Sequence, residues 1–399
     1  MSNHGGKRNG SGRSKLPFDL KKKSYKVYMD IETSKQIELF GIGDSFSSKV
    51  IDLVQSGLTS RSTFQQMKFI DLFAGIGGFR IALEEFGHKC VFSSEIDKYC
   101  QQVYADNFGD LPAAGDITQI SADSIPDFDI LTAGFPCQPF SYAGRQEGFN
   151  DKTRGTLFFD VLRIIKTKKP KMFLLENVKG LKSHNNGETM SIILSSLKEL
   201  GYDVHWKVLD SHKFGVPQKR ERWYCVGFDK KIDFKFPIQT NPNTILKDIV
   251  DIDTVHPDLE LSEFEKNRIK HHFSSSEIRV QHDNSMYAPN TKKGKHGVFS
   301  FLKPDKTLRF HIGDAAKTQI QEAYYCSLDS VAPAIIATRE PKLWDISRRL
   351  SVDECRKLQG FPDTFIFNVS KLQAKKQLGN SVAVPVIREI VRNMLYYYK

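Results

Sequence analysis

The sequence predicts an α/β fold: a doubly wound sheet with a second, smaller and irregular domain. First, short apolar runs rich in β-branched and aromatic residues alternate with amphipathic segments from residue 67 to residue 237. Second, this alternation stops after Phe236, and a polar stretch punctuated by prolines follows as far as residue 346. Third, 40% of the 399 residues are hydrophobic, which is enough for a sizeable core.

The predicted strands are bounded by polar and glycine-containing turns. In chain order they are KFIDLF (68–73), KCVFSS (89–94), FDILTAG (128–134), KMFLLEN (171–177), DVHWKVLD (203–210) and RWYCVGF (222–228). The segments between them have apolar residues three and four apart, as in Leu157, Val161 and Ile164, which predicts helices. These are FRIALEEFG (79–87), DKYCQQVYADNF (97–108), TLFFDVLRIIKTKK (156–169) and ETMSIILSSLKELG (188–201).

The pattern of regular secondary structure resumes near the C-terminus, in LSVDECRKLQGFPD (350–363). An amphipathic helix is predicted in KKQLGNSVAVPVIREIVRNMLYYY (375–398). We therefore divide the chain into four parts. They are a basic N-terminal extension (1–66), an α/β domain (67–237), a smaller irregular domain (238–346) and a C-terminal segment in which regular structure returns (347–399).

The net charge of +11 is confined to two segments. Residues 1–66 carry +5 and residues 266–309 carry +7, so the remainder is close to neutral. A basic excess in two segments favours a polyanionic partner such as nucleic acid. The alternative is that both segments are solvated loops without such a partner. No apolar run reaches the roughly 18 residues of a membrane span, and no apolar stretch follows the charged N-terminus as in a secretory signal. The six cysteines form no Cys-x-x-Cys pair, which favours a reducing cytoplasm and argues against a zinc site.

A glycine-rich turn follows the first predicted strand in FIDLFAGIGGF (69–79). Gly75, Gly77 and Gly78 would let a ligand approach the backbone, and Glu95 ends the next strand where ribose hydroxyls would lie. This pattern fits S-adenosylmethionine or a dinucleotide, and a tight turn without a ligand is a third interpretation. The dinucleotide fingerprint requires a third glycine that the turn lacks.

Reactive side chains are predicted at the same edge of the sheet. Cys137 follows a strand in GFPCQPFS (134–141), Glu176 ends another in LLENV (174–178), and Arg220 and Arg222 precede a third. A thiol, a carboxyl and guanidinium groups that converge on one edge suit nucleophilic chemistry. The alternatives are a cysteine that only fills a turn and a structural ion pair between Glu176 and Arg222.

These motifs, in this order and together with QKRER and KKQLGNSV, resemble those of the DNA (cytosine-5) methyltransferases, most closely the bacterial restriction-modification enzymes. The resemblance covers about residues 67–237 and 345–399 and implies a Rossmann-like S-adenosylmethionine-dependent methyltransferase sheet with a target-recognition domain. It implies methyl transfer to carbon 5 of a flipped-out cytosine in duplex DNA through a covalent Cys137 adduct. Here Lys152 is an extra residue in the motif Asp-Lys-Thr-Arg-Gly, which leaves the register of that loop open.

The resemblance also assigns roles to individual residues. It implies Cys137, Glu176, Arg220 and Arg222 as catalytic, with Glu176 on the ring nitrogen and amine and Arg222 on the base carbonyl, while Arg220 supports the loop. It implies Phe73, Gly75, Gly77, Gly78, Glu95, Asp116, Asn380 and Ser381 as the binding residues for the cofactor, S-adenosyl-L-methionine. It implies substrate contacts at Pro136, Ser141 and Gln218, and no metal.

Within residues 238–346 the basic part, 266–309, is expected to contact mainly phosphates, and TREPKLW (338–344) is the candidate region for base reading. His271 and His272 are expected to face solvent or phosphate. The expected partners are double-stranded DNA and a restriction endonuclease of the same specificity, and the chain is expected to be a monomer in the cytoplasm.

Four other functions are alternatives. A tRNA cytosine-5 methyltransferase would typically carry a Cys-Phe-Thr tripeptide, and an amino-methylating enzyme a Pro-Pro-Tyr motif, and this sequence has neither. An inactive DNA-binding regulator would not need Cys137, Glu176 and Arg222 together. A dehydrogenase would need the missing third glycine. Residues 27–66 could additionally bind DNA and regulate expression, although no clear helix-turn-helix is present there.

Overall fold

The computed structural model describes residues 46–47, 49–50, 65–136, 157–240, 243–253, 257–283, 297–312 and 320–398, with the side chains of 320–322 left out. The chain divides into two units, Met1–Ser56 and Gly57–Lys399. Of the first unit, four residues are described and all are helical. The second unit carries every element discussed below.

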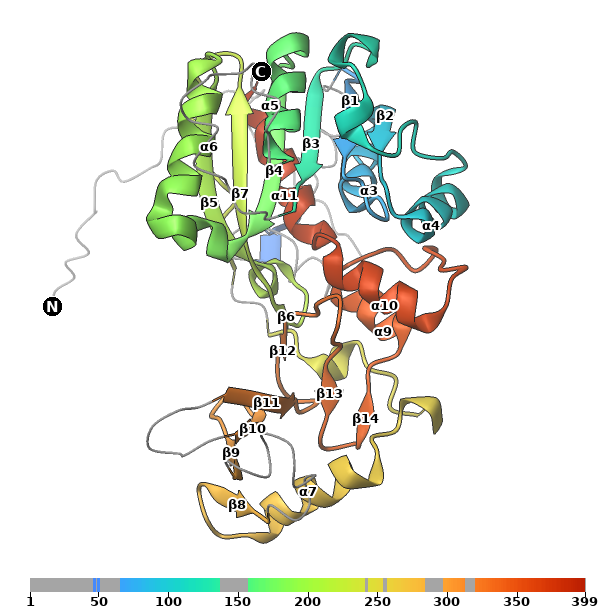
Figure 1. Cartoon of the computed structure of the whole chain (residues 1–399), viewed down its shortest axis with the longest axis vertical. Coiled ribbons are helices and arrows are strands. Elements are labelled where there is room, and N and C mark those ends of the chain that lie inside the picture. Colours follow the sequence, from blue (N-terminus) through green and yellow to red (C-terminus); the bar gives the residue numbers. More distant parts are fainter. Residues whose placement is uncertain are drawn as a thin grey trace, which may run out of the picture. The chain divides into compact units, whose positions relative to one another are not determined.

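A six-stranded sheet in the order β2-β1-β3-β4-β7-β5 forms the centre of the second unit (Figure 1). The first four strands of this order are parallel, and β7 runs antiparallel to both of its neighbours. The six predicted strands are confirmed. They are β1 (Lys68–Leu72), β2 (Lys89–Ser94), β3 (Ile130–Gly134), β4 (Met172–Val178), β5 (Asp203–Asp210) and β7 (Glu221–Phe228).

Helices cover both faces of this sheet, because successive strand residues point in opposite directions. In β1, Phe69 joins the apolar cluster that includes α3 and α11, whereas Ile70 joins the cluster that includes α5 and α6. The helices are α3 (Gly78–Glu84), α4 (Lys98–Phe108), α5 (Phe158–Lys168) and α6 (Glu188–Glu199), as predicted, followed by α9 (Val352–Leu358), α10 (Lys371–Asn380) and α11 (Val384–Tyr397). Within the described ranges, no helix has the length and apolarity that a membrane crossing requires.

The predicted C-terminal helix is two helices, which corrects the sequence interpretation. Chain direction changes between α10 and α11, at residues 381–383. Pro385 lies at the start of α11, where its missing N–H costs no helical hydrogen bond. The carbonyls of Gly379 and Ser381 accept hydrogen bonds from Arg220 at 3.2 and 2.6 Å. The break is therefore fixed by tertiary contacts that helical periodicity does not reveal.

The stretch predicted as irregular contains regular structure (Figure 1). Helix α7 (Glu263–Ser274) packs with an antiparallel sheet in the order β11-β10-β9-β8. These strands are β8 (Val280–His282), β9 (Val298–Leu302), β10 (Leu308–Ile312) and β11 (Ile320–Tyr325). Two two-stranded ladders follow, β12 (Ala332–Pro333) with β6 (Gln218–Lys219), and β13 (Lys342–Leu343) with β14 (Arg348–Arg349). The β6–β12 ladder joins this stretch directly to the segment that carries Arg220 and Arg222.

Two polar side chains of this stretch are buried, and the burial of His272 contradicts its expected exposure to solvent or phosphate. Arg268 is 2% exposed and donates to the hydroxyl of Tyr325 at 3.1 Å from Nε, so it cannot lie on a phosphate-facing surface. His272 is 6% exposed, and its Nδ1 lies 2.8 Å from Oγ of Ser300. Both side chains therefore stabilise the small core between α7 and the sheet.

Candidate active site

The carboxyl ends of β1, β2, β3 and β4 meet at one edge of the central sheet, because these strands are parallel. Phe73 follows β1, Glu95 follows β2, Phe135 follows β3, and Glu176 lies near the end of β4. The β3–β4 ladder pairs Gly134 with Glu176. The structure thus brings together the glycine turn and the carboxyl group that the sequence places there.

The turn after β1 is held in an unusual backbone conformation. Phe73 has a φ of 57°, a left-handed value that is strained for a bulky residue. Among the described residues, a Cβ at Gly75 would meet no atom within 4 Å, whereas a Cβ at Gly77 would lie 2.3 Å from Phe108 and one at Gly78 2.7 Å from Val382. Of these three glycines, Gly75 is therefore the one that the described residues leave uncovered. Gly77 and Gly78 instead allow α4 and the C-terminal segment to pack against the turn.

Glu95 ties the turn to the end of β2. Its Oε2 accepts from the backbone N–H of Gly75 at 2.7 Å, and its Oε1 accepts from that of Asp97 at 2.8 Å. Burial raises the pKa of the Glu95 carboxyl, although these two hydrogen bonds act in the opposite direction. Asp116 caps a short 3₁₀ helix, with Oδ1 accepting from the N–H and the hydroxyl of Thr118. Ser94 at the end of β2 forms a bridge with Ala114, so both carboxyl groups lie near the end of that strand.

Glu176 forms an ion pair with Arg222, with 3.2 Å between Oε1 and Nε. The two side chains are only 12% and 14% exposed. Burial raises the pKa of the Glu176 carboxyl, and the charges of Arg222 and Arg220 partly offset this effect. The pair joins β4 to β7, whose register sets Glu176 beside Tyr224. Burial of the carboxyl group therefore favours its protonated form relative to an exposed glutamate.

Arg220 is 3% exposed, and within the described ranges its side chain donates to main-chain carbonyls. Its Nη1 lies 2.8 Å from the oxygen of Ile335, and its Nη2 contacts Gly379 and Ser381. Burial, together with the charge of Arg222, lowers the pKa of Arg220 to about 10. These bonds connect three distant segments of the chain, which is the geometry that a loop-supporting role requires.

Gln218 is completely buried, and its amide group is used within the protein. Nε2 donates to the carbonyl of Leu358 at 2.9 Å and to Oε1 of Gln359, while Oε1 accepts from the backbone N–H of Ile335. In this geometry the side chain holds Ile335 in place. Its predicted contact with the substrate stays a prediction.

Asn380 is the last residue of α10, and Ser381 follows it next to the glycine turn. Oγ of Ser381 would be 3.1 Å from a Cβ at Gly78, so the two segments are in close contact. Asn380 is exposed, and Ser381 is half-buried. Pro136 is exposed at the end of the described part of the β3 loop. Cys137 and Ser141 lie outside the described residues.

The family model for the C-5 cytosine-specific DNA methylases matches residues 67–396. The chain belongs to this family. Type II methyltransferase M.DsaV of Dactylococcopsis salina is 43% identical over 337 residues, which cover 84% of this chain and 87% of that protein. M.HaeII of Haemophilus aegyptius is 44% identical over 336 residues, which cover 83% and 93%. The solved structure of S. pombe Dnmt2 methyltransferase has the same fold, with a TM-score of 0.58 at 18% identity over 83% of this chain and 99% of that one.

One residue of this cytosine-5 methylase that the sequence prediction omits is Asn177, next to Glu176. It is 2% exposed, and its Nδ2 donates to the carbonyl of Phe135 at 2.8 Å. Its Oδ1 accepts from the backbone N–H of Val178. Phe135 lies two positions before Cys137, so Asn177 holds the backbone just ahead of the cysteine. The signal was present in the sequence, because a polar residue that ends a buried strand needs a partner.

Proposed function

We propose that this enzyme transfers a methyl group from S-adenosylmethionine to carbon 5 of a flipped-out cytosine within a specific short sequence of duplex DNA. The observation that carries the proposal is the buried Glu176–Arg222 ion pair at the edge of the sheet. It lies next to Asn177, which binds the backbone of Phe135, two positions before Cys137. Membership of the cytosine-5 methylase family and similarity to type II methyltransferases support it. We further propose that the enzyme protects host DNA alongside a restriction endonuclease of the same specificity.

The reaction needs a nucleophile because carbon 5 of cytosine is itself too weak to take a methyl group. The thiolate of Cys137 forms a bond to carbon 6, and the electrons of the 5–6 double bond then make carbon 5 nucleophilic. After methyl transfer, a base or water removes the proton from carbon 5. The bond between sulfur and carbon 6 then breaks and returns the Cys137 thiolate.

Glu176 and Arg222 act on the polar edge of the base. A protonated Glu176 donates to the ring nitrogen as negative charge develops there, and its buried position favours this protonated form. Arg222 donates to the carbonyl oxygen of the base. Because the target lies within a duplex, it must leave the stack, at a cost of roughly a few kcal/mol.

The methyl donor would be held at the turn after β1. The open space beside Gly75, the side chain of Phe73 and the carboxyl of Glu95 fit the methionine, adenine and ribose parts respectively. S-adenosylmethionine supplies the electrophilic methyl carbon when it is bound. Asp116 would bind the adenine amine, and Asn380 with Ser381 would close the pocket. We propose a monomer that acts in the cytoplasm.

Incubation with tritiated S-adenosylmethionine and either duplex DNA or tRNA tests the substrate. We expect label in duplex DNA alone, and label confined to tRNA would overturn the proposal. Cys137→Ala should abolish transfer while cofactor binding survives, whereas Cys90→Ala, a change at a half-buried cysteine outside the site, should retain transfer. Bisulfite sequencing of DNA from cells that express the gene would then give the recognition sequence.

A further inference from the structure

A tight turn after β12 lies directly against the groups that organise the active site. Ile336 and Arg339 exchange two backbone hydrogen bonds of 3.1 and 3.0 Å. The preceding carbonyl, that of Ile335, accepts from Arg220. A Cβ at Gly379 would lie 2.2 Å from the backbone of Ile336, so the turn is in close contact with α10. The position of this turn is therefore coupled to the catalytic framework.

Ion pairs hold the residues that follow the turn. Glu340 lies 3.2 Å from Lys375 of α10 and 3.9 Å from Arg349. Lys342 lies 2.6 Å from Glu265 of α7. The segment is thus fastened on both sides, to a helix of the catalytic framework and to the helix of the recognition region.

Arg339 is exposed, and its guanidinium carbon lies 4.5 Å from the centre of the Tyr324 ring. Tyr324 is 4% exposed and belongs to β11, so the ring is a fixed support. In the described part of the chain no carboxylate lies within ion-pair distance of Arg339, although its neighbours Lys342, Arg349 and Lys375 are all paired. Arg339 therefore combines a free positive charge with restricted motion.

We propose that Arg339 reads a guanine in the recognition sequence, by donating to N7 and O6 at its major-groove edge. This inference rests on the proposed function. A planar guanidinium that is oriented by an aromatic ring suits the two-acceptor edge of guanine, which is the commonest specific contact of arginine with DNA. Phosphate contacts, by contrast, do not require an oriented planar group. The rigid turn also sets a fixed relation between the guanine and the cytosine that enters the active site.

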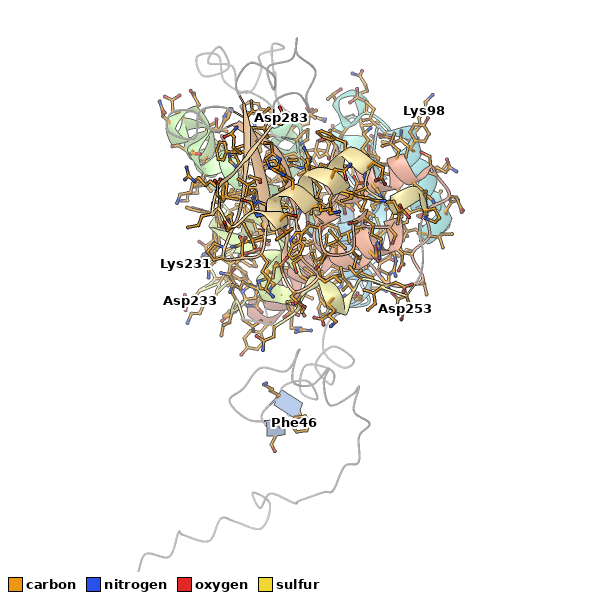
Figure 2. The ribbon with its side chains drawn as sticks, turned by 90° about the horizontal axis from the view of Figure 1, so that it is seen from below. Phe46, Lys98, Lys231, Asp233, Asp253 and Asp283 are labelled. Atoms are coloured by element: carbon orange, nitrogen blue, oxygen red, sulfur yellow. The ribbon has the colours of Figure 1, made fainter. Side chains whose placement is uncertain are left out.

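The test compares the unchanged protein, Arg339→Ala, Arg339→Lys and the charge-matched control Lys231→Ala. Lys231 follows the end of β7 that is remote from Arg222, and it lies near Asp233 in Figure 2. The measurement is kcat/KM on an unmethylated duplex that carries the recognition sequence found by bisulfite sequencing. It is repeated on all single-base variants of that duplex and on duplexes with 7-deazaguanine, which lacks the N7 acceptor. Each is repeated at several salt concentrations.

We expect Arg339→Ala to lower kcat/KM on the specific duplex by roughly ten- to a hundredfold and to abolish discrimination at one guanine. Arg339→Lys should not restore discrimination, and Lys231→Ala should behave as the unchanged protein. For the unchanged protein, kcat/KM should be lower on the 7-deazaguanine duplex than on the guanine duplex. For Arg339→Ala the two duplexes should give the same kcat/KM, because the base change and the substitution remove the same contact.

Two results would overturn the assignment of Arg339 while leaving the proposed function intact. One is an equal loss of kcat/KM on all duplexes, together with a slope of log kcat/KM against log salt concentration that is reduced by about one. This result would indicate a phosphate contact. The other is unaltered base discrimination by Arg339→Ala. If the unchanged protein methylates no duplex at all, the proposed function fails, and the assignment of Arg339 fails with it.

Discussion

Asn177 on β4 donates through Nδ2 to the carbonyl of Phe135, at 2.8 Å, across the sheet edge that carries the site. Both residues are buried, and Oδ1 of Asn177 is used as well. The bond connects β4, which carries Glu176, to Phe135, which lies two positions before Cys137. If Glu176 and Cys137 act as proposed, Asn177 is a positioning residue whose effect passes through the backbone.

Asn177→Ala should lower kcat by about 10²-fold, because a small displacement of a reacting group has an effect of this size. It should also lower the free energy of unfolding by about 1–3 kcal/mol, since the carbonyl of Phe135 would be left without its donor. Cofactor affinity should be unchanged, as measured by calorimetry. The control is Asn393→Ala, which removes a similar bond to the carbonyl of Lys235. An equal loss of kcat in both variants would exclude a positioning role.

The strands and the strand-edge carboxyl could be predicted because they follow local rules. Short apolar runs rich in β-branched and aromatic residues identified β1 to β5 and β7, and Glu176 ends a strand within a specific motif. Helix α7 could not be predicted in this way, since Glu265, Arg268 and His272 point inward and obscure its apolar periodicity. The burial of Gln218 also depends on partners 117 and 141 residues away in the chain. Tertiary hydrogen bonds of this kind leave no pattern in a short window.

The proton on Glu176 predicts a pH-dependent rate. Burial raises the pKa of this carboxyl, so the protonated fraction, and with it kcat, should fall as pH rises through the raised value. The Cys137 thiolate fraction changes in the opposite direction, which predicts a bell-shaped profile. Glu176→Gln should lower kcat by about 10²- to 10⁴-fold and remove the falling limb. A falling limb that persists in Glu176→Gln would show that another group is responsible.

Asp71 predicts a pH-dependent stability. This residue of β1 is fully buried, with Oδ1 accepting from the hydroxyl of Thr132 at 2.9 Å and no hydrogen-bond partner for Oδ2 in the described chain. Burial raises the pKa of Asp71 to about 7, although the Thr132 bond and the charge of Arg80 oppose this. The folded state therefore binds the proton more tightly than the unfolded state, and the stability that this provides is lost as pH rises from about 4 to 7.

Asp71→Asn should remove that loss, which we expect to be on the order of a few kcal/mol in the free energy of urea unfolding between pH 4 and 8. Asp129 is the matched comparison. Partial burial opposes the effect, but the hydrogen bond from Lys171 lowers the pKa of Asp129, so its contribution is lost as pH falls. Asp129→Asn should thus flatten the acid side of the profile. If the free energy of unfolding varied with pH in the same way for Asp71→Asn and the unchanged protein, Asp71 would not be the group responsible for the loss of stability.

The contact of Gly78 with Ser381 and Val382 predicts that the glycine turn and the C-terminal motif are packed as one unit. A Cβ at Gly78 would lie 2.7 Å from Cγ2 of Val382, and the residue has no left-handed φ, so Gly78→Ala would act through crowding alone. We expect it to lower the free energy of unfolding by about 1–3 kcal/mol. It should also weaken cofactor binding, because it displaces Ser381, which we propose as a cofactor-binding residue. Gly180→Ala is the control, since its Cβ would meet no atom of the described residues within 4 Å. Urea unfolding measures the effect on stability, and calorimetric titration with S-adenosylmethionine measures the effect on cofactor affinity. A Gly78→Ala variant that is less stable but binds the cofactor with unaltered affinity would place Ser381 outside the cofactor site.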